Sequence, residues 1–221
     1  MERFFPPKDC SSKTKNMRNL HIEGLLLMAV LMVMLSSSMM LIGRAFFEIL
    51  FFNTGLSADL MYSNQGEMSE MLENGNMYDM LTYEPEFSPL YEAYSSAMKI
   101  LSVTGYILAF LSIAGSIVLL ILMKIVCRRI AEDATPVKNP VMVKKTAYVW
   151  LGFLLGCFGG QFFLYNNKKA IIFLCMGIIG MMFPVFILYT TGISFADAFL
   201  ACFISKDENG MITIEDYPYW I

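Results

Sequence analysis

The side chains best suited to metal or nucleophilic chemistry are few in this 221-residue chain, and they lie far apart. The sequence has one histidine, His21, and five cysteines, at positions 10, 127, 157, 175 and 202. They form no CxxC pair and no Cys-His spacing typical of zinc. No Ser-His-Asp set, paired intramembrane acids or phosphate-binding glycine loop can be placed either. We therefore expect no cofactor, no metal and no enzymatic activity.

Two polar residues in apolar stretches are candidates for a role inside a membrane. Asp197 is a candidate for ion or proton binding, because carboxylates at membrane depth are often functional. Ser194 precedes it at the S-x-x-D spacing of a capping box, however, and this favours a structural role at a helix start. Gln161 is the second candidate, and its amide is predicted to hydrogen-bond to a neighbouring helix.

The tail from Ser205 to Asp216 matches part of a calcium-binding EF-hand loop. Asp207, Asn209 and Asp216 stand at three of its positions. Because Ser205 replaces the first acidic ligand and the last position lacks a glutamate, we favour an Asn-Gly turn instead. That turn is predicted to join Phe203-Ile204 to Met211–Ile214 as a short hairpin.

The composition places these residues in a membrane protein. The chain is 57% hydrophobic and only 16% charged, which is too apolar for a soluble fold. Its net charge of −3 gives no basic field of the kind that nucleic-acid binding needs. The lipid bilayer is therefore the expected partner, and nucleic acid is not.

The hydropathy pattern predicts an all-α integral membrane protein with four transmembrane helices and a short helical acidic outer segment. The first helix is placed at 22–44, as an uncleaved anchor rather than a signal peptide, because no cleavage site follows it. The second is placed at 99–127, within a continuous helix that begins at Ser88-Pro89 and reaches Arg129. A helical hairpin at 148–204 supplies the other two, at 148–165 and 170–191.

The apolar stretch 170–204 is too long for one straight membrane helix. It would measure about 52 Å, against about 30 Å of hydrocarbon. A break is therefore required either at Pro184 or at Thr190-Thr191-Gly192, and we favour the second, followed by a helix along the membrane surface.

The distribution of charge predicts the orientation. Eleven of the sixteen basic residues lie in the tail 1–21 or close to the linker 128–147, and we expect both segments in the cytoplasm. The segment 45–98 is acidic and is expected outside. The tail 205–221 is then cytoplasmic, with Lys168-Lys169 in an outer turn as the one exception.

Small residues line two of the predicted helices. Gly152, Gly156 and Gly160 form a tandem GxxxG with Gly159 beside them, and Gly105 and Ala109 form a similar stripe in the second helix. Such faces let backbones approach closely. Whether they pack within the chain or between chains is open at this stage.

The hairpin resembles a known family. The residues that carry the resemblance are Lys144-Lys145, the run FLLGCFGGQFF from Phe153 to Phe163, the polar turn, the next apolar helix and Asp197. Together they resemble the two-transmembrane (TM-two) domain family over about residues 144–204. Gln161 stands where that family has histidine, and Phe162 where it has arginine. The resemblance implies a bacterial cell membrane and no established chemistry.

From these features we expect a scaffold or accessory membrane protein. It is expected to assemble with itself or with other membrane proteins through its glycine-lined faces and acidic outer segment. A small channel or transporter subunit is the alternative, and it requires polar residues that converge at mid-membrane depth.

Overall fold

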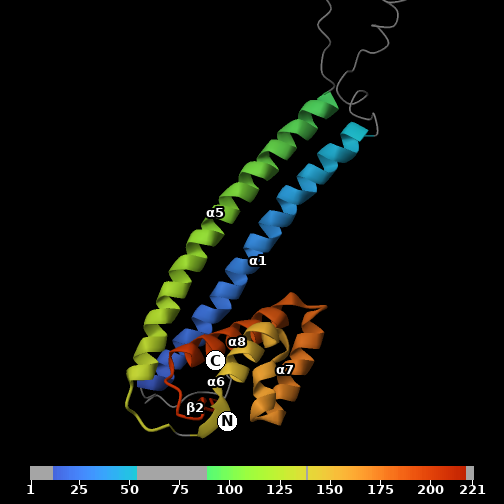
Figure 1. The fold of residues 1–221 in the computed structure, drawn as a ribbon. Coiled ribbons are helices and arrows are strands. Elements are labelled where there is room, and N and C mark those ends of the chain that lie inside the picture. The colour runs from blue at the N-terminus through green and yellow to red at the C-terminus, as the bar shows by residue number, and fades with distance from the viewer. Residues whose placement is uncertain (1–11, 54–88, 138, 218–221) are drawn as a thin grey trace, which may run out of the picture. The chain divides into compact units, whose positions relative to one another are not determined.

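The computed structural model describes residues 12–53, 89–137 and 139–217, and most of the acidic segment 45–98 lies outside these ranges. The elements, in order, are α1 (Ser12–Asn53), α5 (Pro89–Glu132), β1 (Pro140–Lys144), α6 (Lys145–Leu154), the 3-10 helices η1 (Gly156–Phe158) and η2 (Gly160–Leu164), α7 (Asn167–Gly180), α8 (Pro184–Phe203) and β2 (Met211–Glu215) (Figure 1). They fall into two compact units, residues 1–32 with 113–221 and residues 33–112.

Three of the described helices are long and apolar enough to cross a membrane, within Ser12–Phe46, Ala93–Glu132 and Pro184–Phe203. The protein is therefore a mostly helical, membrane-embedded protein. α1 and α5 include the predicted spans 22–44 and 99–127, and α5 begins at Pro89 and runs without a break, as predicted. With 42 and 44 residues, these two helices measure about 63 and 66 Å, twice the hydrocarbon thickness.

The prediction of a straight helix at 148–165 is wrong. α6 ends at Leu154, and the chain then curls through η1 and η2 until the rings of Tyr148 and Tyr165 lie 6.2 Å apart. A straight helix separates these residues by about 26 Å. Gly159 permits the curl, because its φ of 66° lies in the left-handed region that side chains disfavour.

The preferred break at Thr190-Thr191-Gly192 is also wrong. α8 begins at Pro184 and continues through these residues, so no surface helix starts at Ser194. Proline lacks the amide hydrogen that a helix interior needs, and it occupies the first turn here. Thr190 fits the helix interior because its Oγ1 donates a hydrogen bond to Phe186 O at 3.0 Å.

Both ends of the α7–α8 hairpin lie on the same side of the unit. Asn166, which caps α7, donates from Nδ2 to Asp216 Oδ2 at 3.1 Å, and Lys169 Nζ bonds to Asp216 and to Tyr217 O. Burial lowers the pKa of Lys169 although Asp216 opposes the shift. The turn predicted to lie outside therefore lies beside the C-terminal tail, and four spans are not confirmed.

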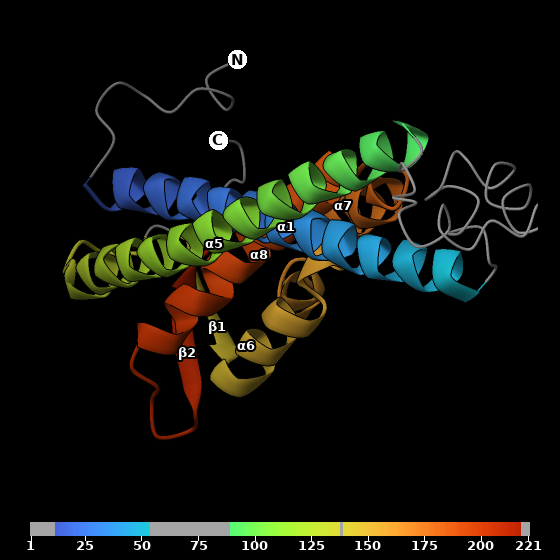
Figure 2. The ribbon, with the colours of Figure 1, turned by 90° about the horizontal axis from the view of Figure 1, so that it is seen from above.

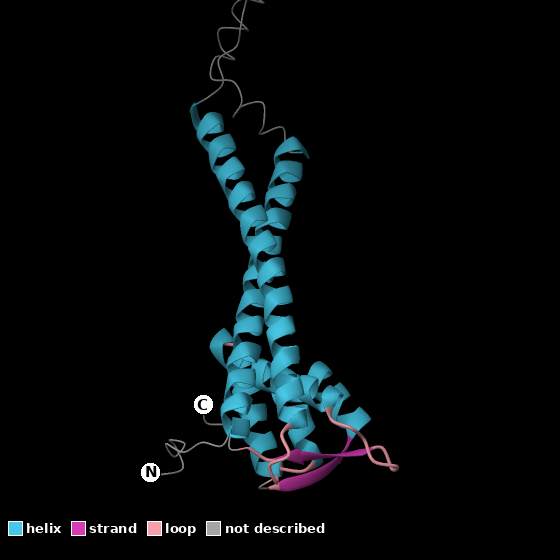
Figure 3. Ribbon diagram, turned by 90° about the vertical axis from the view of Figure 1, so that its left-hand side faces the viewer, coloured by secondary structure: helices cyan, strands magenta, loops and turns pink. Residues whose placement is uncertain are grey.

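The all-α prediction misses a two-stranded antiparallel sheet. β1 pairs with β2 from Pro140 opposite Glu215 to Lys144 opposite Met211 (Figure 3). The tail therefore pairs with the linker 128–147 and not with Phe203-Ile204. The Asn-Gly turn itself forms, with φ of 74° at Gly210.

α8 crosses α1 and α5 within the first unit (Figure 2). Their shared core consists of apolar residues from all three helices: Met17, Leu20, Leu27, Met123, Val126, Cys127, Ile130, Ala196 and Leu200. At the crossing, a Cβ on Gly24 would lie 2.5 Å from Gly192 O, and one on Gly192 would lie 2.9 Å from Leu25 Cα. The two backbones are therefore in direct contact.

In the second unit, α1 packs on α5 through the predicted small-residue stripe. Gly105 lies against Leu41, whose Cδ2 would be 3.2 Å from an added Cβ, while Ala109 is half-buried. Arg44 donates a hydrogen bond to Ser102 Oγ. This face is used inside the chain.

Gly24→Ala tests the helix crossing. We expect it to lower the free energy of unfolding by about 1–3 kcal/mol, because the added methyl group has to push α8 away. Gly43→Ala is the matched control in the same helix, since an added Cβ meets nothing within 4 Å there. Thermal or denaturant unfolding in detergent measures both, and equal stabilities for the two variants contradict the crossing.

Met182→Cys tests how deeply the hairpin enters the membrane. α7 has 14 residues, about 21 Å, which is shorter than the hydrocarbon layer. In a background without native cysteines we expect the new thiol at the 81%-exposed tip to resist an impermeant reagent applied to either side. If Met182→Cys is labelled from one side of the membrane and Thr135→Cys from the other, the hairpin crosses the membrane completely.

Candidate functional site

The most unusual polar contact in the described residues joins α1 to α8. His21 Nε2 lies 2.8 Å from Asp197 Oδ1, and both residues are 5% exposed. The close helix crossing makes the contact possible, because an aspartate side chain is short. His21 lies one turn before Gly24, and Asp197 lies five residues after Gly192.

Apolar side chains enclose the pair on the helix side. Leu20, Met123, Cys127 and Ala196 are all fully buried around the crossing. In such surroundings neither a histidine nor a carboxylate is stable without a partner. The two residues therefore depend on each other for their burial.

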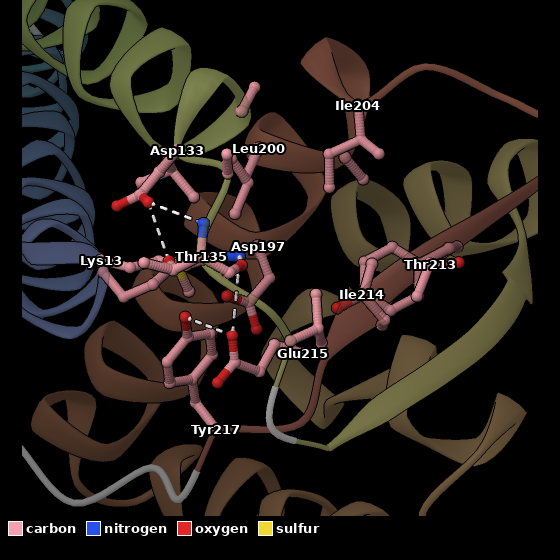
Figure 4. Close-up of a pocket in the computed structure, with 17 residues that line it drawn as sticks. Lys13, Asp133, Thr135, Asp197, Leu200, Ile204, Thr213, Ile214, Glu215 and Tyr217 are labelled. Atoms are coloured by element: carbon pink, nitrogen blue, oxygen red, sulfur yellow. Dashed lines mark hydrogen bonds and ion pairs between the residues drawn. The ribbon is translucent and has the colours of Figure 1, made fainter. Parts of the chain in front are cut away.

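The other side of Asp197 faces a pocket of about 250 Å³. Its polar lining comes from α1, the chain after α5, α6, α8 and the chain at and after β2: Lys13, Asp133, Thr135, Tyr148, Asp197, Thr213, Glu215 and Tyr217 (Figure 4). The volume is large enough for several water molecules. Segments predicted to be cytoplasmic, 1–21, 128–147 and 205–221, thus meet at one pocket.

Hydrogen bonds order the rim of the pocket. Lys13 Nζ lies 3.8 Å from Glu215 Oε2 and donates to Thr135 O at 3.4 Å. Tyr217 donates from its hydroxyl to Glu215 Oε2 at 2.9 Å, and burial together with this bond raises the pKa of Tyr217. The bonds that Asp133 accepts from the Thr135 amide and hydroxyl lower the pKa of Asp133.

Gln161 and Ser194 lie one turn of α8 away from Asp197, and both are completely buried. Gln161 Nε2 donates to Ser194 O at 3.4 Å, so the predicted bond to a neighbouring helix is present. Gln161 Oε1 and Ser194 Oγ have no hydrogen-bond partner among the described residues. Polar atoms thus continue along α8 beyond Asp197.

The tandem glycines lie on this same face of α8. An added Cβ on Gly152 would be 2.6 Å from Ala198 Cβ, and one on Gly156 would be 3.0 Å from Ser194 Cβ. Gly159 lies against Phe173, and Gly160 against Leu155. The structure therefore answers the open question for these glycines: they pack within the chain.

The capping role predicted for Asp197 is wrong. α8 begins thirteen residues earlier, at Pro184, so Ser194 and Asp197 lie in the interior of the helix. The serine and the aspartate follow the capping spacing, but the helix does not start there.

The tail does not form the calcium loop. Asp207 Oδ1 accepts hydrogen bonds from the amides of Asn209 at 3.0 Å and Met211 at 2.7 Å. Asp216 points instead to Asn166 and Lys169. These contacts separate the two carboxylates and use each of them in a local structural role.

Sequence reasoning did not connect His21 with Asp197. The two residues are 176 positions apart, and each was considered alone. The available signal was that each is an ionisable residue on an otherwise apolar helical face. Such residues often pair with one another.

Comparisons with known proteins add no further assignment. No family model matches the chain, and no curated protein and no solved structure shows significant similarity to it.

Substitutions at Asp197 test the mutual dependence of the pair. Asp197→Leu is expected to cost about 1–3 kcal/mol of unfolding free energy, because it removes the buried hydrogen bond between the carboxylate and the imidazole. Asp197→Asn keeps an acceptor and is expected to cost less. Asp133→Asn, at the exposed rim, is the control, and denaturant unfolding in detergent ranks the three. A leucine variant as stable as the asparagine variant contradicts the dependence.

Proposed function

We propose that this is a non-enzymatic, multi-pass membrane protein of the scaffold or accessory type, which binds a transmembrane helix of a partner protein or of a second copy. The glycine faces pack inside the chain, so a partner needs a different surface. The best candidate is an exposed apolar stripe on α1.

This stripe consists of the most exposed large apolar residues of α1: Leu35, Met39, Ile42, Phe46 and Ile49, each 58–64% exposed. Successive residues of the stripe are 4, 3, 4 and 3 positions apart, which is the spacing of the a and d positions along the seam of a coiled coil. The stripe also continues past Arg44, beyond the charge-free part of the helix. This spacing is the observation that carries the proposal.

The orientation belongs to the same proposal. The lysine and arginine bias supports a cytoplasmic position for the pocket end of the chain and for both termini, with the acidic segment 45–98 outside. We also propose that the protein lies in the membrane of a bacterial cell and that residues 144–204 belong to the TM-two family.

A channel or transporter subunit is the second candidate. It is favoured by one observation, the convergence of His21, Asp197, Gln161 and Ser194 inside the helical core. Polar residues in such positions often mark ion or proton routes.

A photo-crosslinking amino acid at Phe46 tests the scaffold proposal in intact membranes. We expect a discrete protein adduct from this position, and mass spectrometry of the adduct identifies a partner or a second copy. Phe163, 49% exposed in η2, is the matched control and is expected to give none. Adducts with lipid alone at Phe46, or equal protein capture at both positions, overturn the proposal.

A further inference from the structure

We propose that the His21–Asp197 pair is a proton-exchange site, and that the pocket is the route by which protons reach it from water. The ligand of this site is the proton itself. The inference does not depend on the scaffold proposal, since it concerns a different surface and a different chemistry.

The geometry of the pair provides the place for the proton. The 2.8 Å separation between His21 Nε2 and Asp197 Oδ1 is a hydrogen-bond distance, so one proton lies between the two atoms. Imidazole gains or loses a proton near neutral pH more readily than any other side chain.

The pocket provides access. Asp197 is buried against the helices, but it lines the pocket. A purely structural pair needs no such opening, and well-packed apolar residues often stabilise a core as much as a buried ion pair does. An ionisable pair that reaches a polar cavity inside a membrane-embedded protein is better explained by proton binding.

Other titratable groups act on Asp197 from several of the elements around it, and Glu23 of α1 acts on Cys127 beside the pair. Those that interact electrostatically with Asp197 are Cys127 of α5, Tyr148 of α6, Lys169 of α7 and Tyr217 after β2. Lys13, Asp133 and Glu215 stand at the rim. The rim carries two carboxylates and one lysine, so its charge favours the approach of protons rather than of anions.

The polar line along α8 extends the site inward. Ser194 lies about 4.5 Å along the helix axis from Asp197, on the same face. Its hydroxyl can both donate and accept, and Gln161 Oε1 offers a further acceptor beside it. These groups are the next polar positions along α8 beyond the pair.

His21 is the only histidine, so a histidine-specific measurement reports on this site alone. The full chain, purified with a tag free of histidine, is labelled with ¹⁵N-histidine and studied by NMR in lipid nanodiscs between pH 5 and 9. We expect the ring nitrogen signals to change reversibly with pH while the helical circular dichroism stays constant. Signals that do not change, or that change only as helicity is lost, overturn the proposal.

Two variants identify the partner of the ring. Asp197→Asn is expected to change the chemical shifts of the His21 ring nitrogens at a fixed pH, because it alters the group bonded to Nε2. Glu208→Gln, on the exposed turn between α8 and β2, is expected to leave these shifts unchanged. Equal changes in both variants show a general charge effect and overturn the pairing. If Asp197→Asn does not fold, the titration of the unmodified protein still decides the proposal.

Discussion

The backbone contact between α1 and α8 at Gly24 and Gly192 is the constraint on which the rest of the first unit depends. It brings two helices within reach of a short carboxylate, and it closes the apolar core of Met17, Leu20 and Met123 around them. In lipid there is little hydrophobic drive to bring helices together, so close packing and polar contacts have to supply the attraction. Here a small-residue crossing and a buried hydrogen bond occur within one turn of each other on α1, and each depends on the other's geometry.

A second group of glycines shapes the chain on the face of α8 that carries Ser194 and Ala198, away from the Gly192 contact with α1. Gly152 and Gly156 let α6 and η1 lie flat against it, and Gly159 then turns the chain back. A pattern that in a straight helix is typical of association is used here to fold a segment onto its neighbour. These glycines are therefore occupied by contacts within the chain.

The sequence predicted the first two helices well because their length and lack of charge leave few alternatives, and the Ser-Pro pair marks where α5 begins. It failed at 148–165 because hydropathy does not distinguish a helix exposed to lipid from a curled segment packed on α8. It placed the break seven residues too late because Thr190 satisfies its hydroxyl within the helix, which no local rule revealed. The site was only half predicted: Gln161 and Asp197 were identified, but the contact with His21 depends on tertiary structure alone, as does the pairing of β1 with β2.

That strand pair has a consequence for how the chain is made. β1 is synthesised about 67 residues before the first residue of β2, so at ordinary rates of translation its edge waits roughly 3–13 s for its partner. During that time Val141 and Val143 form an open edge of the kind that pairs with other chains. Pairing with the C-terminal strand covers this edge and closes residues 145–210 into a loop.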